Sequence, residues 1–229
     1  MTYLYQKQIK HFEHYENVGL KVYVVDGFGH KDYYNSSKRH YLQSHLLKNF
    51  KLVKDRLRFN GREIIIEFDD VQWAGNYANA IKVIDFLQKN SIPYELIITG
   101  GRGLRFSIFT KINYAQSTIF ALYCYSCYLI GIDWQTSGMP ENKAVNHCVG
   151  CIGKIGKLGY YATYSKEVPE KRPQIKIFEV QFPEKVELWN VSKKFLVNAL
   201  DYASKIPKKE VMKNYEKFKY KKPLLELKW

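Results

Sequence analysis

Three carboxylates lie within four positions, directly after an apolar run at residues 64–66: they are Glu67, Asp69 and Asp70. The run consists of β-branched isoleucines, which predicts a buried strand. Side chains alternate between the two faces of a strand, so Glu67 and Asp69 point to the same side with Cβ atoms about 6–7 Å apart. Two like charges at this separation repel unless a cation lies between them, and carboxylate oxygens suit Mg²⁺ or Mn²⁺. The sequence therefore predicts a divalent-metal site, whereas Asp70 has the alternative role of a helix cap.

A second candidate element is the glycine-rich sequence TGGRGLR at residues 99–105. Glycine lets backbone N–H groups approach an anion closely. Arg102 and Arg105 add positive charge, and arginine binds phosphate through two parallel hydrogen bonds. Carboxylates suited to a metal ion, together with a turn suited to phosphate, are typical of nucleotide chemistry.

The segments around these motifs predict the elements that hold them in place. In chain order the expected elements are a helix at 76–90, strands at 94–98 and 106–109, and a long apolar helix at 116–130. Pro93 ends the first helical pattern, because proline lacks the N–H that a helix needs. Gly131 is suited to cap the second helix, and Asp133 lies just beyond it.

The rest of the chain carries weaker patterns. They predict a strand at 20–25, one or two helices within 36–57, a strand at 175–182 near the sheet edge, and a last helix at 191–206. Basic and aromatic residues between 30 and 62 are suited to holding phosphates and stacking on bases, as in a template channel. The lysine-rich end has three open roles: docking on the body, binding template, or recruiting a helicase or primase partner.

Taken in order, the motifs resemble those of the archaeo-eukaryotic primase superfamily, which includes the primase-polymerases of plasmids, viruses and archaea. The first family motif is a hydrophobic strand ending in two acidic residues one position apart, as Glu67 and Asp69 are. The second is a small hydroxyl residue followed by spaced glycines and a histidine. Its matching residues are Thr99, Gly100 and Gly103. Arg105 stands where the histidine is expected.

The resemblance continues downstream. The third family motif is an aspartate after a hydrophobic residue, which Ile132 and Asp133 match. Family members then carry a lysine-containing stretch that holds nucleotide phosphates, and GCIGKIGK at 150–157 is similar to it. Its lysines, Lys154 and Lys157, are three positions apart with glycines before and between them, so both can approach one phosphate chain. The likeness extends over residues 62–160.

The resemblance implies an α/β (α+β) fold with an RRM-like antiparallel or mixed sheet and flanking helices. It implies a primase-polymerase catalytic domain at 1–206, followed by a basic C-terminal segment at 207–229. The implied reaction is template-directed transfer of a nucleotide from NTP or dNTP to a 3′-hydroxyl, or primer synthesis, with two Mg²⁺ or Mn²⁺ ions. The implied metal ligands and catalytic residues are Glu67, Asp69 and Asp133. The implied nucleotide-binding residues are Thr99, Gly100, Arg102, Gly103, Arg105, Lys154 and Lys157. The implied partners are a single-stranded DNA template or primer-template, and replication proteins such as a helicase.

Two other hypotheses stay open. A non-catalytic relative would use the same scaffold to bind nucleic acid or a replication partner, which suits Arg105 and the glutamate at 67, a position that is often aspartate in the family. In a catalytic member, Arg105 would instead contact the triphosphate in place of histidine. A metal-dependent nuclease would use the same carboxylates but needs no triphosphate cradle. The sequence lacks the paired histidines of a rolling-circle replication endonuclease.

The composition favours a polyanionic partner. The 229 residues include 36 Lys and Arg against 22 Asp and Glu, a formal net charge of +14. Nucleic acid is the simplest match for such a charge, and a generally basic proteome is the alternative. No stretch approaches the about 18 uncharged apolar residues of a membrane span, and the first ten residues lack the apolar segment of a signal peptide. A soluble, cytoplasmic protein is therefore expected.

The cysteines form two CxxC pairs separated by 20 residues: Cys124 with Cys127, and Cys148 with Cys151. This spacing suits a structural Zn²⁺ site with four thiolates, for which His147 is a spare ligand. The first pair lies inside the apolar helix at 116–130, where cysteine is also an ordinary small core residue. Structural zinc, buried thiols and disulfide bonds therefore remain three open interpretations.

Overall fold

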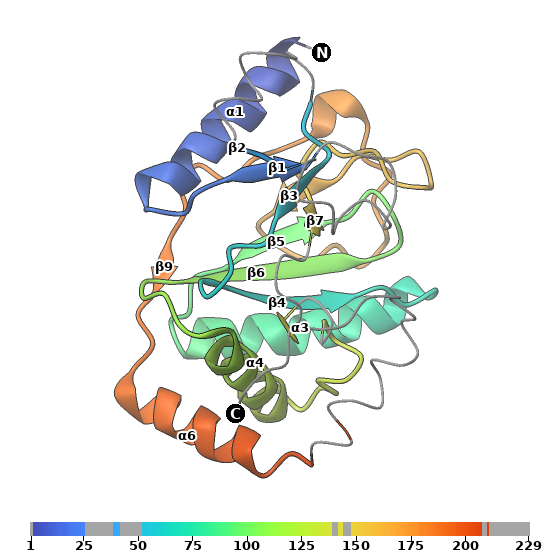
Figure 1. Ribbon diagram of the computed structural model, residues 1–229. Helices are drawn as coiled ribbons and strands as arrows, with labels where there is room; N and C mark the ends of the chain where they lie inside the picture. The colour runs from blue at the N-terminus through green and yellow to red at the C-terminus, as the bar shows by residue number, and fades with distance from the viewer. Residues whose placement is uncertain are drawn as a thin grey trace.

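The computed structural model describes residues 2–25, 39–41, 52–138, 142–143, 148–207 and 210. In this part of the chain a central sheet lies between a layer of helices and a second, smaller sheet with a helix beside it (Figure 1). The elements in chain order are α1 (Thr2–Asn17), β1 (Tyr23–Val25), β2 (Arg39–Tyr41), β3 (Asp55–Leu57), β4 (Glu63–Phe68), α3 (Trp73–Lys89), β5 (Glu95–Ile98), β6 (Leu104–Thr110), α4 (Gln116–Ile130), β7 (Cys148–Gly150), β8 (Thr163–Ser165), the 3₁₀ helix η3 (Ile177–Glu179), β9 (Leu188–Trp189) and α6 (Lys193–Ser204).

The central sheet has the strand order β4-β6-β5-β8 with antiparallel neighbours, and β9 pairs in parallel with the end of β6. The chain runs from β4 through α3 to β5 and then turns back into β6, which lies between the two earlier strands. In the register of β4 and β6, Glu67 pairs with Arg105 and Glu63 with Phe109. We call the end of the central sheet that carries Glu67 and the 99–103 turn the glycine-turn end. The other end of the same strands, which carries Glu63 and Glu95, is called the opposite end.

One face of the central sheet is apolar and packs on α3 and α4. Alternation along β4 turns Ile64, Ile66 and Phe68 toward these helices. The helices present matching stripes, and Val83 and Leu87 of α3 are fully buried at helical spacing. Each fully buried side chain of this kind contributes about 1.5–3 kcal/mol. On the far side of α4 lies α6, so the helical layer is two helices deep there (Figure 1).

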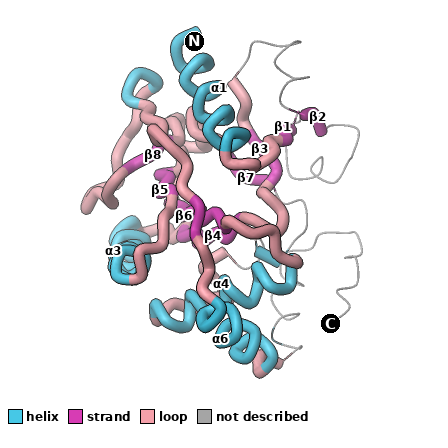
Figure 2. The backbone as a smooth tube through the Cα atoms, turned by 90° about the vertical axis from the view of Figure 1, so that its left-hand side faces the viewer, coloured by secondary structure: helices cyan, strands magenta, loops and turns pink. Residues whose placement is uncertain are grey.

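The other face of the central sheet is partly polar and is covered by α1 and the sheet β2-β1-β3-β7 (Figure 2). The ring of Tyr15 in α1 lies edge-on to Phe59 and Phe109, with centroids 5.0 and 5.3 Å away. Gln8 acts as a backbone clamp, because its amide accepts from the Val53 N–H at 2.7 Å and donates to the Val53 carbonyl at 2.9 Å. A buried amide that satisfies both backbone groups fixes the position of α1 against the small sheet.

The coarse expectation, a mixed α/β protein with antiparallel sheets and helices, is confirmed. The expected strands at 94–98 and 106–109 correspond to β5 and β6, and the helix at 116–130 corresponds to α4. α3 begins at Trp73, three residues earlier than its apolar spacing suggests, with Gln72 as the N-cap residue. Asp70 is therefore not the cap. Its Oδ1 accepts from the Gln72 N–H at 3.1 Å and closes a turn before the helix.

One expectation about secondary structure is wrong. Residues 175–182 form no strand; η3 occupies their centre, and the Lys176 N–H donates to Glu179 Oε2 at 2.6 Å and closes a local turn. Within 36–57, the described residues 39–41 and 52–57 include strands β2 and β3, which both pair with β1. The helical spacing at 42–47 lies outside the described residues, so the helices expected there stay a prediction. Residues 26–38, 42–51 and 211–229 lie outside the described residues, and so do most of the expected template channel and the C-terminal segment. Among the helices that the structure describes, none has the length and apolar character to cross a membrane.

Candidate functional site

The glycine-rich turn between β5 and β6 is closed by Thr99. Its backbone N–H donates to the Gly103 carbonyl at 3.0 Å, and its hydroxyl donates to the same carbonyl at 2.9 Å. The Gly103 N–H donates back to that hydroxyl at 3.2 Å. The hydroxyl of the expected phosphate-binding motif therefore fixes the shape of the turn, and the residues between Thr99 and Gly103 form its tip.

This turn packs directly on the end of β4. A methyl group added at Gly103 would overlap the Phe68 carbonyl oxygen and press on Asp69, so the backbone requires glycine here. Next to it, Nη2 of Arg102 lies 3.9 Å from Oδ2 of Asp69, and both side chains are about half exposed. Exposed ion pairs of this length hold their partners weakly, so both charges are accessible to a ligand.

A second glycine-containing turn, at 153–159, meets the first one backbone to backbone. A methyl group at Gly100 would overlap the Tyr160 carbonyl and the Gly156 nitrogen, and one at Gly156 would overlap the Gly100 carbonyl. Lys157, which follows Gly156, is exposed. The two stretches that the sequence assigns to phosphate binding are therefore joined at the glycine-turn end.

Asn76 joins β4 and the glycine turn, and sequence motifs did not reveal it. It is buried in the first turn of α3, where its Oδ1 accepts from the Asp70 N–H at 2.9 Å. Its Nδ2 donates to the carbonyls of Asp70 at 3.2 Å and Arg102 at 3.1 Å. In the sequence it stands at the start of a predicted helix, and an asparagine there does not by itself indicate these contacts. One amide thus fixes the carboxylate-bearing loop relative to the tip of the turn.

Arg172 and Trp73 hold a further segment over the glycine turn, and they too were missed. Arg172 donates to the Gly101 carbonyl, and its guanidinium lies 5.8 Å from the ring centroid of Tyr160. The indole N–H of Trp73 donates to the Pro169 carbonyl at 2.9 Å. The segment 169–172 therefore runs from the start of α3 to the tip of the turn. The charged sequence around it, KEVPEKRP at 166–173, resembles an ordinary solvated loop and gave no signal.

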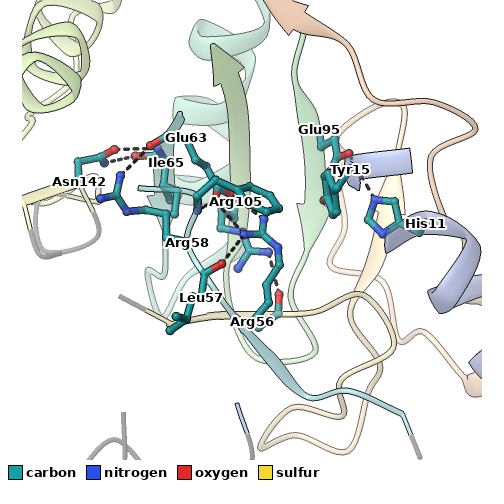
Figure 3. Close-up of polar contacts among 12 residues, drawn as sticks. His11, Tyr15, Arg56, Leu57, Arg58, Glu63, Ile65, Glu95, Arg105 and Asn142 are labelled. Atoms are coloured by element: carbon teal, nitrogen blue, oxygen red, sulfur yellow. Dashed lines mark hydrogen bonds and ion pairs between the residues drawn. The ribbon is translucent and has the colours of Figure 1, made fainter. Parts of the chain in front are cut away.

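Arg105 does not lie at the surface of the turn. It is buried on β6 and faces the second sheet, where Nη2 donates to the Gly150 carbonyl of β7 at 2.8 Å (Figure 3). Its Nε and the hydroxyl of Ser107 are buried and have no hydrogen-bond partner among the described residues. Arg105, which was expected at a nucleotide's triphosphate, therefore ties the central sheet to β7.

Of the two lysines expected at the phosphates, one is held by the second sheet and the other is exposed. Nζ of Lys154 lies 2.6 Å from Oδ1 of Asp55, a buried residue of β3 that pairs with Gly150. Lys157 is exposed on the turn beside Gly156. Lys154 therefore anchors its turn to the second sheet, and Lys157 is the lysine that is accessible from solvent.

Of the three predicted metal ligands, Glu67 and Asp69 lie together at the end of β4, half-buried and exposed respectively. Asp133 is exposed in the turn after α4, where its carboxylate accepts from the Gln135 N–H at 2.9 Å and from the Thr136 hydroxyl at 3.3 Å. The chain then reaches Ser137, whose carbonyl accepts from the Glu67 N–H at 3.1 Å. The described residues contain no group of three His, Cys, Asp or Glu side chains placed to hold one metal ion. The pair on β4 suits a hard divalent ion, but the three-carboxylate set is not assembled.

The structure does not bring the two cysteine pairs together. Cys124 and Cys127 are buried in the core between the central sheet and the helices, whereas Cys151 is buried in the core beneath α1. Burial raises the pKa of the Cys151 thiol to about 12 and raises those of Cys124 and Cys127 further. All four cysteines lie in the described part of the chain, and none forms a disulfide bond. His147, the spare ligand, lies outside the described residues. This arrangement favours buried thiols over zinc or disulfides.

Comparisons with family models, curated proteins and solved structures find no match to this chain. Function therefore has to be inferred from the residues and contacts at the glycine-turn end.

Proposed function

We propose that the protein is a nucleotidyltransferase of the primase-polymerase kind, which adds nucleotides from NTP or dNTP to a 3′-hydroxyl opposite a DNA template. One observation carries the proposal: three separate stretches meet at the glycine-turn end. The contact at Gly103 joins the turn to the carboxylates of β4, and the contact between Gly100 and Gly156 joins it to the lysine-bearing turn. These are the stretches whose sequences resemble the metal-binding and phosphate-binding motifs of that superfamily.

The arrangement of the sheet also supports this proposal. The chain order β4-α3-β5-β6-α4, the strand order β4-β6-β5 and the two helices on one face are what an RRM-like core requires. The edge of β4 away from β6 is covered by the segment that follows Asp133. There, the Asn142 amide donates to the Ile65 carbonyl and its oxygen accepts from the Ile65 N–H at 2.9 Å.

In the proposed site, backbone N–H groups of the 99–103 turn and the exposed side chains of Arg102 and Lys157 bind the triphosphate. Glu67 and Asp69 hold the divalent ion, with Asp133 as the remaining candidate ligand. A bound ion supplies charge stabilisation for the pyrophosphate that leaves and lowers the pKa of the 3′-hydroxyl. Arg105 acts through position: its bond to Gly150 fixes β7, and thereby the turn that carries Lys157.

Incorporation of labelled NTP and dNTP on single-stranded DNA tests this function directly, with Mg²⁺ or Mn²⁺ and with or without a primer. We expect extension by the wild type and a loss of at least about a hundredfold in Asp69→Ala, because the carboxylate at the exposed end of β4 is removed. Asp85→Ala is the matched control, since Asp85 is an exposed carboxylate on α3 outside the site. Equal extension by Asp69→Ala and Asp85→Ala would show that β4 does not carry the activity.

A second candidate function is non-catalytic binding of nucleic acid on the same scaffold. Two observations favour it: Arg105 is buried rather than presented to a nucleotide, and the Asp133 carboxylate is hydrogen-bonded within its own turn. In that case the wild type would bind single-stranded DNA with a strong dependence on salt and would incorporate nothing. Incorporation itself separates the two functions, because only a catalytic protein adds nucleotides, whereas either protein would bind single-stranded DNA.

A further inference from the structure

A pocket of about 300 Å³ opens at the opposite end of the central sheet, away from the nucleotide site proposed above. The buried residues Glu95 and Phe109 line it from β5 and β6, Tyr164 lines it from β8, and Phe182 lines it from the segment after η3. This volume is at the lower end of the range for small-molecule sites, which are mostly apolar with a few polar groups that fix the ligand. Glu95 is the only residue in the described lining that is both buried and acidic.

Among the described residues, the Glu95 carboxylate has two hydrogen-bond neighbours, and neither is a permanent cation. The Tyr15 hydroxyl donates to Oε2 at 2.6 Å, and His11 Nε2 lies 3.4 Å from Oε1 (Figure 3). The Glu95 side chain is only 5% exposed. A carboxylate has about four acceptor positions, so these contacts leave two of them available. A buried carboxylate without a full positive partner is costly, which makes Glu95 a strong acceptor for a cationic ligand.

The same sheet shows how this protein accommodates a buried cation. Glu63 is the first residue of β4, just as Glu95 is the first residue of β5. The Glu63 carboxylate accepts from both Nη atoms of Arg56 at 2.8 Å. The guanidinium of Arg56 also lies over two rings, 4.3 Å from the Phe59 centroid and 5.2 Å from the Tyr15 centroid. A planar guanidinium fits this combination because it forms two parallel bonds with a carboxylate and stacks on aromatic faces. Glu95 and the rings around it repeat the combination without the arginine.

We propose that the Glu95 pocket binds a guanidinium group, supplied by a small guanidinium compound or by an arginine side chain of a peptide. Glu95 accepts the two N–H bonds, and the rings of Tyr164 and Phe182 cover the planar faces of the group. The site is distinct from the glycine-turn end, so it does not depend on nucleotidyl transfer.

The charges at the pocket mouth agree with a cationic ligand. Lys185 is paired with Glu187 at 2.6 Å, which leaves the exposed Glu184 and Lys166 as further charges of the lining. Burial raises the pKa of Tyr164, and the charges of Glu95, Glu184 and Glu187 raise it further. The lining holds three carboxylates, those of Glu95, Glu184 and Glu187, against the two lysines Lys166 and Lys185, although the whole chain is strongly basic.

Titration of the full chain with propylguanidinium and with propylammonium, at low ionic strength and followed by calorimetry, tests the proposal. We expect saturable binding of propylguanidinium with Kd below about 1 mM, and binding of propylammonium at least about fivefold weaker, because a single ammonium cannot form the two parallel bonds. A capped Gly-Arg-Gly peptide distinguishes the sources: tighter binding than propylguanidinium indicates an arginine side chain, and weaker binding indicates a small compound.

Glu95→Gln keeps the shape of the side chain and an acceptor for Tyr15 but removes the charge, so we expect an affinity loss of about tenfold. Glu170→Gln, an exposed carboxylate outside the pocket lining, is the control and should leave Kd unchanged. If Glu95→Gln does not fold, amide chemical shifts of the wild type decide the matter. Saturable shifts at 94–95, 164–166 and 181–187 support the site. No binding to folded wild type, unchanged affinity in Glu95→Gln, or shifts only elsewhere would overturn it.

Discussion

At the glycine-turn end of the central sheet, Arg102 and Asp69 lie 3.9 Å apart and remain about half exposed, whereas at the opposite end Arg56 and Glu63 lie 2.8 Å apart and are buried. Both are arginine–carboxylate pairs that involve β4 or the residue after it. The charges of the buried pair contact protein atoms instead of water and stabilise the fold. The charges of the exposed pair remain accessible to solvent and to ligands. The difference separates an ion pair that stabilises the fold from one whose charges remain accessible to a ligand.

The largest expected effect concerns the buried pair. Arg56→Met leaves Glu63 buried without its cation, and breaking such a pair costs about 3–5 kcal/mol of the free energy of unfolding. Lys205→Met is the control, because it breaks an exposed pair with Asp201 that is 2.6 Å long and is worth less than about 1 kcal/mol. Urea denaturation of both variants measures the difference. If the two variants lose similar free energies of unfolding, the buried Arg56–Glu63 pair does not stabilise the protein more than an exposed pair does.

The acid response of Glu63 gives the next largest effect. Burial by itself would raise the pKa of Glu63, but the Arg56 charge and the hydrogen bonds from Arg56 and the Phe59 N–H lower it from 4.5 to about 2. The unfolded chain binds the proton at higher pH than the folded one does. The stabilisation is therefore fully present above about pH 4.5 and is lost as pH falls toward 2, an effect of about 3 kcal/mol.

The free energy of unfolding of wild type and Glu63→Gln, measured from about pH 6 down to about pH 2, tests this linkage. The wild type should lose stability across the window, and the variant should show a shallower slope because it has no carboxyl group to titrate at this position. Parallel profiles would show that acidic groups elsewhere govern the response.

At the glycine-turn end, Gly103→Ala should cost about 2–3 kcal/mol, because its methyl group would overlap the Phe68 carbonyl and the backbone has to move. Gly101→Ala is the control in the same turn, since among the described residues its methyl group would meet only Thr99 Oγ1, at an ordinary 3.6 Å. Thermal unfolding of the two variants distinguishes them. Equal stability would contradict the close packing of the turn on β4.

The smallest effect is expected from the exposed pair. Arg102→Gln should leave the free energy of unfolding nearly unchanged, because the side chain is 48% exposed and its contact with Asp69 is long. It should weaken nucleotide binding about threefold to tenfold, since a charge-assisted bond to phosphate is lost. The KM for NTP or dNTP in primer extension measures this. A loss of stability without a change in KM would assign Arg102 to the fold.

Local pattern was enough to predict much of the glycine-turn end. Alternation and β-branching indicated β4, and the switch to helical spacing indicated α3 and α4. In these cases the relevant signal lies within about ten residues, the scale on which side-chain periodicity operates.

The remaining features depend on contacts between distant segments. Gly100 and Gly156 meet only because β8 pairs with β5, and nothing in either glycine stretch encodes the other. Arg105 was expected at the triphosphate, yet the second sheet supplies a carbonyl at Gly150 that holds it inside. Glu63 and Glu95 looked like ordinary polar ends of strands, because burial of a carboxylate shows only when its partners are in place.

Nucleotide binding at the glycine-turn end is the most direct test of the account. Backbone amide shifts of the wild type should be recorded during titration with dTTP or GTP in the presence of Mg²⁺. We predict saturable, Mg²⁺-dependent shifts at residues 67–70, 99–105 and 153–160, with residues 94–95 and 181–187 unaffected. A folded protein that shows no saturable shift at the first set, or that responds only at the second, would contradict the assignment of this end to nucleotide chemistry.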